Sequence, residues 1–136
     1  MKLPQGFGAY VANIGIKDTS QDLTLVVAES ACVAAGVFTQ SRFSGPSVVV
    51  SRENIADNSA RAVVVISKNA NVATGVEGMS NAREVVKTVA AKIGCKATKA
   101  VPAATVVILI ARKKPMKCNA SNTPAAIAHL TPARSR

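Results

Sequence analysis

The sequence predicts an α/β fold, in which a mixed layer of strands is packed against helix. Three observations predict this class. Short runs rich in β-branched residues, bounded by Gly, Pro, Asn or Asp, recur through the first two thirds of the 136 residues. One amphipathic helix follows them, and a continuous apolar run suited to a central strand comes after it. The composition, 49% hydrophobic and 18% charged, is that of a globular chain.

Four runs are predicted to be strands. They are DLTLVVAE (22–29), AAGVFTQ (34–40), SVVVSRE (47–53) and ARAVVVIS (60–67). In the first of them, Leu23, Leu25 and Val27 occupy one alternating face. Several of the runs are apolar on both faces, which suggests a sheet that is covered on each side.

A helix is predicted over residues 81–93. Ser80 or Asn81 can cap its start, and Glu84 lies three residues after Asn81, as in a capping box. Gly94 follows in the usual position for a helix end. The apolar side chains that recur at helical spacing are Val85, Val86, Val89, Ala90 and Ile93. Of these, the stripe of Val85, Val89 and Ile93 is expected to pack on the sheet.

The end of the chain divides into two parts. The run TVVILIA (105–111) is predicted to be a strand inside the sheet. Residues 112–136 have no apolar period and contain three prolines, so this segment is predicted to be disordered. We therefore expect two regions, a part of one domain over residues 1–111 and a basic tail over residues 112–136.

The net charge of +10 is confined to one part of the sequence. Residues 1–84 hold seven basic and seven acidic side chains, whereas residues 85–136 hold ten basic residues and no acidic one. Such a tail can neutralise phosphates, which makes a nucleic-acid or polyanion-binding module the alternative function. The tail has no aromatic residue for base stacking, so only non-specific binding to nucleic acid is expected.

Neither a metal site nor a membrane span is predicted. Cys32, Cys95 and Cys118 lie far apart without C-x-x-C spacing, and are interpreted as buried or idle thiols. The single histidine, His129, has no Asp, Glu or Cys near it in the sequence. No segment nears the roughly 20 apolar residues that cross a bilayer, and the start lacks a secretory signal. A cytoplasmic protein without a membrane partner is expected.

Two longer stretches resemble a known enzyme family in their order and spacing. They are GVFTQSRFSGPSVVVSRE (36–53) and ARAVVVISKNANVATGVEGMSNAREV (60–85), with LPQGF near the start. These residues are similar to the N-terminal, α-chain part of the ornithine acetyltransferase family. Its members are also called glutamate N-acetyltransferases or arginine biosynthesis J-type proteins. The resemblance covers residues 3–95.

The resemblance implies a layered α/β sandwich and a defined reaction of arginine biosynthesis. Family members move an acetyl group from N-acetylornithine to glutamate; some also accept acetyl-coenzyme A, and no other cofactor is implied. The precursor cleaves itself before a threonine, which becomes the N-terminal nucleophile of a β chain. A Thr-Gly pair forms the oxyanion hole. The implied partners are a small acetylated amino acid, the β chain and further copies in a hetero-oligomer.

The chain departs from the family at the residues that carry this chemistry. Where the family has the stretch S-T-G-V-I-G, this sequence has LIARKKPM (109–116), and it has no counterpart of the cleavage region. No catalytic residue is therefore assigned. We expect an acetyltransferase-like segment, truncated or frame-shifted after about residue 111, that is inactive on its own. Assembly with a separately encoded remainder stays open.

The turn NANVATG supplies the candidate site. Asn69, Asn71, Thr74 and Gly75 follow a buried strand and precede the predicted helix. Asn tolerates left-handed backbone geometry and Gly permits positive φ, so the stretch can be a turn alone. Loops at strand ends in α/β layers also form ligand sites, and the four residues are candidates for lining a substrate site.

Overall fold

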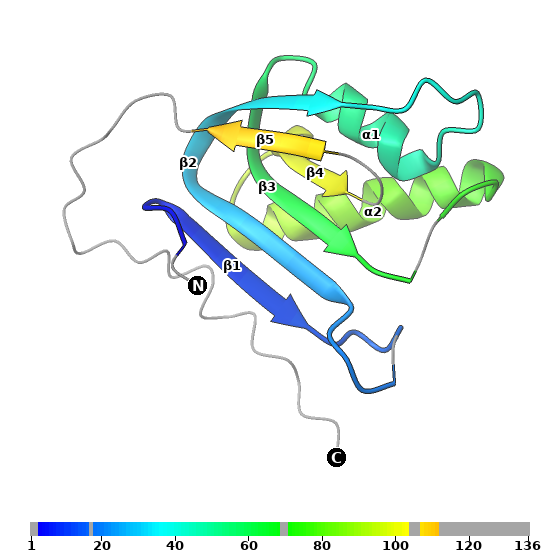
Figure 1. The fold of residues 1–136 in the computed structure, drawn as a ribbon, viewed down its shortest axis with the longest axis horizontal. Helices are drawn as coiled ribbons and strands as arrows, with labels where there is room; N and C mark the ends of the chain where they lie inside the picture. Colours follow the sequence, from blue (N-terminus) through cyan, green and yellow to red (C-terminus); the bar gives the residue numbers. More distant parts are fainter. Residues whose placement is uncertain (1–2, 17, 69–70, 104–106, 112–136) are drawn as a thin grey trace.

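The computed structural model describes residues 3–16, 18–68, 71–103 and 107–111 (Figure 1). Within these ranges it has five strands in one sheet, two α-helices and one 3-10 helix. The strands are β1 (Phe7–Ala12), β2 (Leu23–Val37), β3 (Ser59–Ile66), β4 (Ala100–Ala103) and β5 (Val107–Ala111). The helices are α1 (Pro46–Asn54), α2 (Gly75–Ile93) and the 3-10 helix η1 (Ala97–Lys99). A mixed sheet with helices confirms the predicted α/β class.

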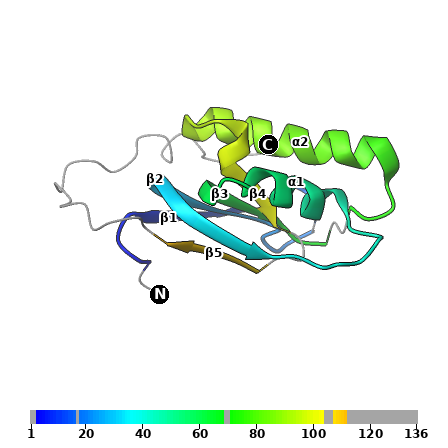
Figure 2. The same cartoon turned by 90° about the horizontal axis from the view of Figure 1, so that it is seen from above.

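The sheet has the order β1-β2-β3-β4, with β5 paired to β2. The pairs β1–β2, β2–β3 and β2–β5 are antiparallel, and β3–β4 is parallel. The connection from β3 to β4 contains α2, as a parallel pair requires. Both α-helices lie on the same face of the sheet (Figure 2). Among the described residues, helices thus cover one face, whereas the sequence suggested cover on each side.

The two strands expected over 22–29 and 34–40 are one continuous strand, β2. Its register with β3 shifts between Val27 and Cys32, which marks an irregularity where the strand bends. The first half pairs with β1 and β3, and the last five residues pair with β5. The polar stretch between the halves is exposed at Glu29 and Ser30 but keeps its extended backbone, so the predicted break is wrong.

The strand predicted over 47–53 is wrong, because this segment forms helix α1. Pro46 occupies the first turn, where its fixed φ suits a helix and its missing N–H costs nothing. Valine is less favourable than alanine in a helix by only about 0.5 kcal/mol. Burying a valine side chain stabilises by about 1.5–3 kcal/mol, and α1 buries Val48 and Val50. Tertiary burial therefore outweighs the local β preference.

Helix α2 is confirmed, but it begins earlier than predicted. Thr74 is its N-cap residue, ahead of Ser80 and Asn81, and Gly94 ends it with φ 66°, as expected. The buried stripe is also rotated from the predicted one. Its members are Gly78, Ala82, Val86, Ala90 and Ile93. Val85 and Val89, predicted to face the sheet, are half-buried at the side of this stripe.

The remaining strands are β1, β3, β4 and β5, and two of them were predicted from the sequence. The strand predicted over 60–67 is confirmed as β3, and that over 105–111 is confirmed as a strand for the described residues of β5. The predicted position of 105–111 inside the sheet is not found, because β5 pairs with β2 alone among the described strands. The sequence assigned no strand to β1 or to β4, which contains Pro102. Proline is tolerated there because β4 pairs with a single neighbour, β3, in the described sheet. The tail prediction concerns 112–136, which lies outside the described residues.

Candidate functional site

The turn between β3 and α2 is built from left-handed backbone conformations. Lys68, Asn71 and Ala73 have φ of 65°, 38° and 59°, and Gly75 has φ 61°. The predicted roles of Asn71 and Gly75 as residues that accept positive φ are confirmed. Asn69 lies outside the described residues, so the structure does not place it.

The strand end before this turn is attached to the loop between β1 and β2. The backbone N–H of Ser67 donates to the carbonyl oxygen of Asp22 at 2.8 Å, and the Ser67 hydroxyl donates to the same oxygen at 3.3 Å. The carboxylate of Asp22 accepts from the backbone N–H groups of Ile14 and Ile16, both at 2.7 Å. Asp22 is 2% exposed, so a buried carboxylate accepts these two hydrogen bonds, and the Asn13 amide adds a bond within the loop by donating to the Ser20 carbonyl oxygen at 2.7 Å.

Asn71, Thr74 and Gly78 form a hydrogen-bonded cluster at the start of α2, here called the Asn71 cluster. The Asn71 amide Nδ2 donates to the carbonyl oxygen of Gly78 at 3.0 Å. The Thr74 hydroxyl donates to Oδ1 of Asn71 at 2.6 Å. The side chain of Asn71 thereby bridges the turn and the first turn of the helix, which fixes how α2 leaves the sheet.

Gly78 is required by this close approach. A Cβ at position 78 would lie 1.7 Å from Thr74 Oγ1 and 2.6 Å from Thr74 Cβ, and 2.5 Å from Asn71 Oδ1. Distances below 3.0 Å force atoms to move. Gly78 was not among the candidate residues predicted from the sequence, although its spacing of four residues after Thr74 places both on one side of a helix.

We expect Gly78→Ala to destabilise the chain by about 1–3 kcal/mol, the range for overpacked sites. Helix propensity alone predicts the opposite sign, because alanine is favoured over glycine by about 1 kcal/mol. Urea unfolding followed by circular dichroism measures the difference. The double variant Thr74→Gly/Gly78→Ala removes Oγ1 and Cβ of Thr74. Its loss of unfolding free energy should be smaller than the sum of the losses in the two single variants. Additive losses within about 0.5 kcal/mol would contradict the proposed clash.

The polar atoms of the Asn71 cluster can position a ligand. The recorded acceptor for the Thr74 hydroxyl is an amide oxygen, which does not take a proton at neutral pH. Activation of a threonine requires an adjacent base. Thr74 and Gly75 are exposed at the surface, so a ligand can reach them. Lining of a substrate site by Asn71, Thr74 and Gly75 stays a prediction.

A groove of about 440 Å³ runs beside α2 and was not found from the sequence. Its residues on α2 recur at spacings of three and four, so they form a second stripe next to the buried one. This second stripe, in which valines alternate with polar residues, was the sequence signal that could have revealed the groove. The residues that line the groove are Ile14, Leu23, Val64, Ile66, Asn81, Glu84, Val85, Thr88 and Val89.

The remaining chemical groups suggest no additional centre in the described part of the chain. No three His, Cys, Asp or Glu side chains there lie together as metal ligands would. Cys32 is buried, and its thiol donates to the Ser30 carbonyl oxygen at 3.4 Å. Cys95 is half-buried; burial raises the pKa of its thiol, and the positive charge of Arg61 offsets part of that rise. Cys118 and His129 lie outside the described residues. Among the helices of the described ranges, none has the length and apolarity to cross a membrane.

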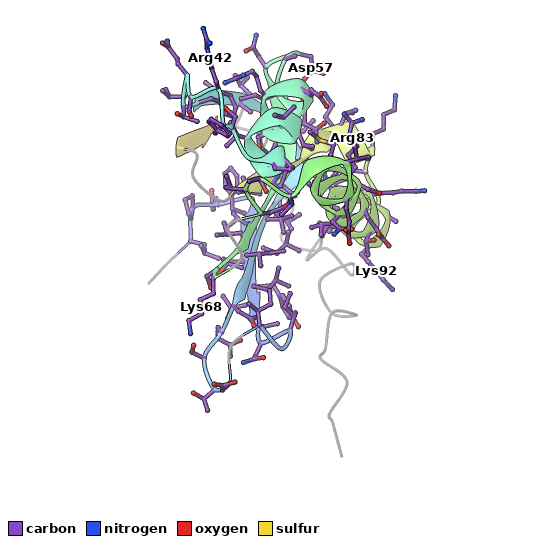
Figure 3. All side chains as sticks on the ribbon, turned by 90° about the vertical axis from the view of Figure 1, so that its right-hand side faces the viewer. Arg42, Asp57, Lys68, Arg83 and Lys92 are labelled. Atoms are coloured by element: carbon purple, nitrogen blue, oxygen red, sulfur yellow. The ribbon has the colours of Figure 1, made fainter. Side chains whose placement is uncertain are left out.

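The basic side chains of the described residues are distributed over α2, the loops, and single positions such as Arg52 of α1 and Arg61 of β3. Figure 3 shows Arg83 and Lys92 on α2, and Arg42 and Lys68 outside the helices. Arg83 pairs with Glu53 of α1 at 3.1 Å, and Lys99 pairs with Asp57. The basic residues numbered 112 and above, on which the polyanion alternative depends, lie outside the described residues.

Comparison with known sequences gives one consistent family. The family model described as the ArgJ family matches residues 8–135, further along the chain than the motifs noted above. The chain is 47% identical to arginine biosynthesis bifunctional protein ArgJ 2 of a Nostoc species over 105 residues, which are 77% of this chain and 27% of that protein. It is 47% identical over 117 residues to glutamate N-acetyltransferase Oat2 of Streptomyces clavuligerus, covering 85% of this chain and 29% of that one.

Solved structures share the fold. An ornithine acetyltransferase from Mycobacterium tuberculosis, complexed with ornithine, matches with a TM-score of 0.70 and 30% identity, over 73% of this chain and 55% of that chain. An ArgJ protein from Bacillus halodurans also gives a TM-score of 0.70, with 26% identity over 72% of this chain and 52% of that chain. The chain spans less than a third of the length of the Nostoc and Streptomyces clavuligerus proteins.

Proposed function

Because this chain belongs to the ArgJ family, we propose that it is the N-terminal, α-chain part of an enzyme that transfers acetyl groups between small amino acids in arginine biosynthesis. The observation that carries the proposal is the match to the family over residues 8–135. Relatives named glutamate N-acetyltransferase and ornithine acetyltransferase indicate the substrate class, acetylated ornithine as donor and glutamate as acceptor. Acetyl-coenzyme A is proposed as a second acetyl donor. The location proposed for this biosynthetic enzyme is the cytoplasm.

The described residues are proposed to hold and line the active site, and not to carry out its chemistry. The Asn71 cluster holds the start of α2 at a strand end, where ligands of α/β folds commonly bind. Asn71 and Thr74 can line a substrate pocket, and the Thr74 hydroxyl donates to the Asn71 amide oxygen, which is not a base. The nucleophile and the oxyanion donors must come from the remainder of the enzyme, a β chain assembled with this one.

We expect the isolated chain to transfer no acetyl group. Without a nucleophile the covalent route is absent, and each missing oxyanion donor typically costs about 10²–10³ in rate. The test measures radiolabelled acetyl transfer from N-acetylornithine to glutamate. The 136-residue chain is assayed alone and after co-expression with the part of Nostoc ArgJ 2 that follows the matched residues, here called the remainder.

Transfer is expected only with both pieces present, and the remainder alone serves as the control. A complex of both pieces that transfers no acetyl group would contradict the proposed function. Transfer by the chain alone, abolished by Thr74→Ala, would contradict the assignment of Thr74 to a lining role. The polyanion-binding alternative receives no support from the described residues and stays a prediction about residues 112–136.

A further inference from the structure

The groove beside α2 is shaped to hold a helix. Its floor is apolar and comes from the sheet, through Leu23 of β2 and Val64 and Ile66 of β3. One wall is the second stripe of α2, and the other is Ile14 of the loop between β1 and β2. Ile14 is 51% exposed, and Leu23 and Ile66 are half-buried, so part of the apolar surface of the groove is open.

We propose that this groove is the seat of one amphipathic helix supplied by the remainder of the ArgJ domain. The inference rests on the proposed function and specifies which surface of this chain the remainder contacts. The helix would lie beside α2, over the β1–β2 side of the sheet, and complete the helical layer that α1 and α2 begin (Figure 2).

The dimensions of sheets and helices support a single helix. Neighbouring strands lie about 4.8 Å apart, so two strands span about 10 Å. Helices packed side by side lie about 8–10 Å apart, which means that one helix covers about two strands. In the described sheet α2 lies nearest to β4, and the cluster around its buried stripe reaches Val64 of β3 and Leu25 and Val27 of β2, with Tyr10 of β1 at its edge. No α-helix of the described ranges lies over β1. The strands β1 and β2 are together about 10 Å wide, the width of one helix.

The chemistry of the groove specifies the face of its occupant. The apolar floor requires an apolar stripe on the incoming helix. Asn81, Glu84 and Thr88 form the polar rim on the α2 side, and Glu84 is the charged residue among those that line the groove. The basic residues of α2, such as Lys87 and Lys92, lie outside this lining. The occupant should therefore carry Lys or Arg beside its apolar stripe, opposite Glu84.

The length of the relatives indicates where this helix comes from. The chain covers 27% of the Nostoc protein and 29% of the Streptomyces clavuligerus protein. The two solved relatives are matched over only 52% and 55% of their own chains, although the fold agrees at a TM-score of 0.70. A large part of each relative is therefore available to pack against this segment.

Thr88→Trp is the test, with Ala91→Trp as its matched control. Both positions are exposed on α2, but only Thr88 lines the groove. Each tagged variant is co-expressed with the untagged remainder of Nostoc ArgJ 2, and the amount of remainder that co-purifies is measured. Thr88→Trp should reduce it at least tenfold, and Ala91→Trp by less than twofold. Circular dichroism of each purified variant verifies that the chain is folded.

A second pair of variants keeps the test decisive if Thr88→Trp fails to fold. Glu84→Lys should also reduce co-purification, and Lys87→Glu, on the same helix outside the groove, should not. Equal effects of groove and control variants would overturn the proposal, as would a remainder that never co-purifies. Self-association of the chain that Thr88→Trp abolishes would identify a second copy as the occupant instead. Failure of the acetyltransferase proposal gives a different result, a complex that is sensitive to Thr88→Trp but catalytically silent.

Discussion

Val86→Asp is expected to leave the chain unfolded at 25 °C. Val86 is 3% exposed and packs in the cluster that joins α2 to the sheet, with Leu25, Val27 and Val64 among its neighbours. A carboxylate placed there is buried without a partner. The loss should be about 4 kcal/mol or more, which is most of the stability of a small domain.

Two neighbouring substitutions provide the scale for this result. Val89→Asp, at a half-buried position beside the groove, should cost clearly less, because the charge can reach water. Lys87→Asp, exposed on the same helix, should change the free energy of unfolding by less than about 1 kcal/mol. Circular dichroism without denaturant tests whether Val86→Asp is folded, and urea unfolding gives the free energies of unfolding of the variants that are. A larger loss at Val89 than at Val86 would show that the predicted stripe, and not the observed one, faces the sheet.

Asp22→Asn is expected to destabilise by about 2–4 kcal/mol, since hydrogen bonds to a charged group contribute about 1.5–3 kcal/mol each. Asp22 accepts from Ile14 N–H through Oδ1 and from Ile16 N–H through Oδ2. Asparagine keeps one oxygen, and its NH₂ group then faces a donor. The loop that carries Ile14 should loosen, and one wall of the groove with it.

Asp18→Asn is the matched control, because Asp18 lies in the same loop, carries the same charge and is exposed. It should change the stability by less than about 0.5 kcal/mol. Amide hydrogen exchange gives the local measurement, in which Ile14 and Ile16 should lose protection in Asp22→Asn but not in Asp18→Asn. If both amides stay protected in Asp22→Asn, the carboxylate does not hold the loop.

The family and the class of fold could be predicted from the sequence because their signals are local. The stretch NANVATGVEG and the motifs before it resemble one family in order and spacing, and the family match supports that resemblance. The β-branched run in residues 60–67 and the glycine at position 94 are local signals as well, and β3 and the end of α2 were predicted correctly. The sequence alone thus determined that the chain is an α/β segment of an acetyltransferase family.

Tertiary structure decided the features that depend on distant partners. Residues 47–53 became α1 because burial of Val48 and Val50 exceeds a β preference of a few tenths of a kcal/mol per residue. Gly78 is needed because Thr74 and Asn71 approach it, and the groove exists because Ile14 is held opposite α2 by Asp22. Local propensity cannot encode such contacts, because their free energy arises only after separate segments are brought together and exclude water.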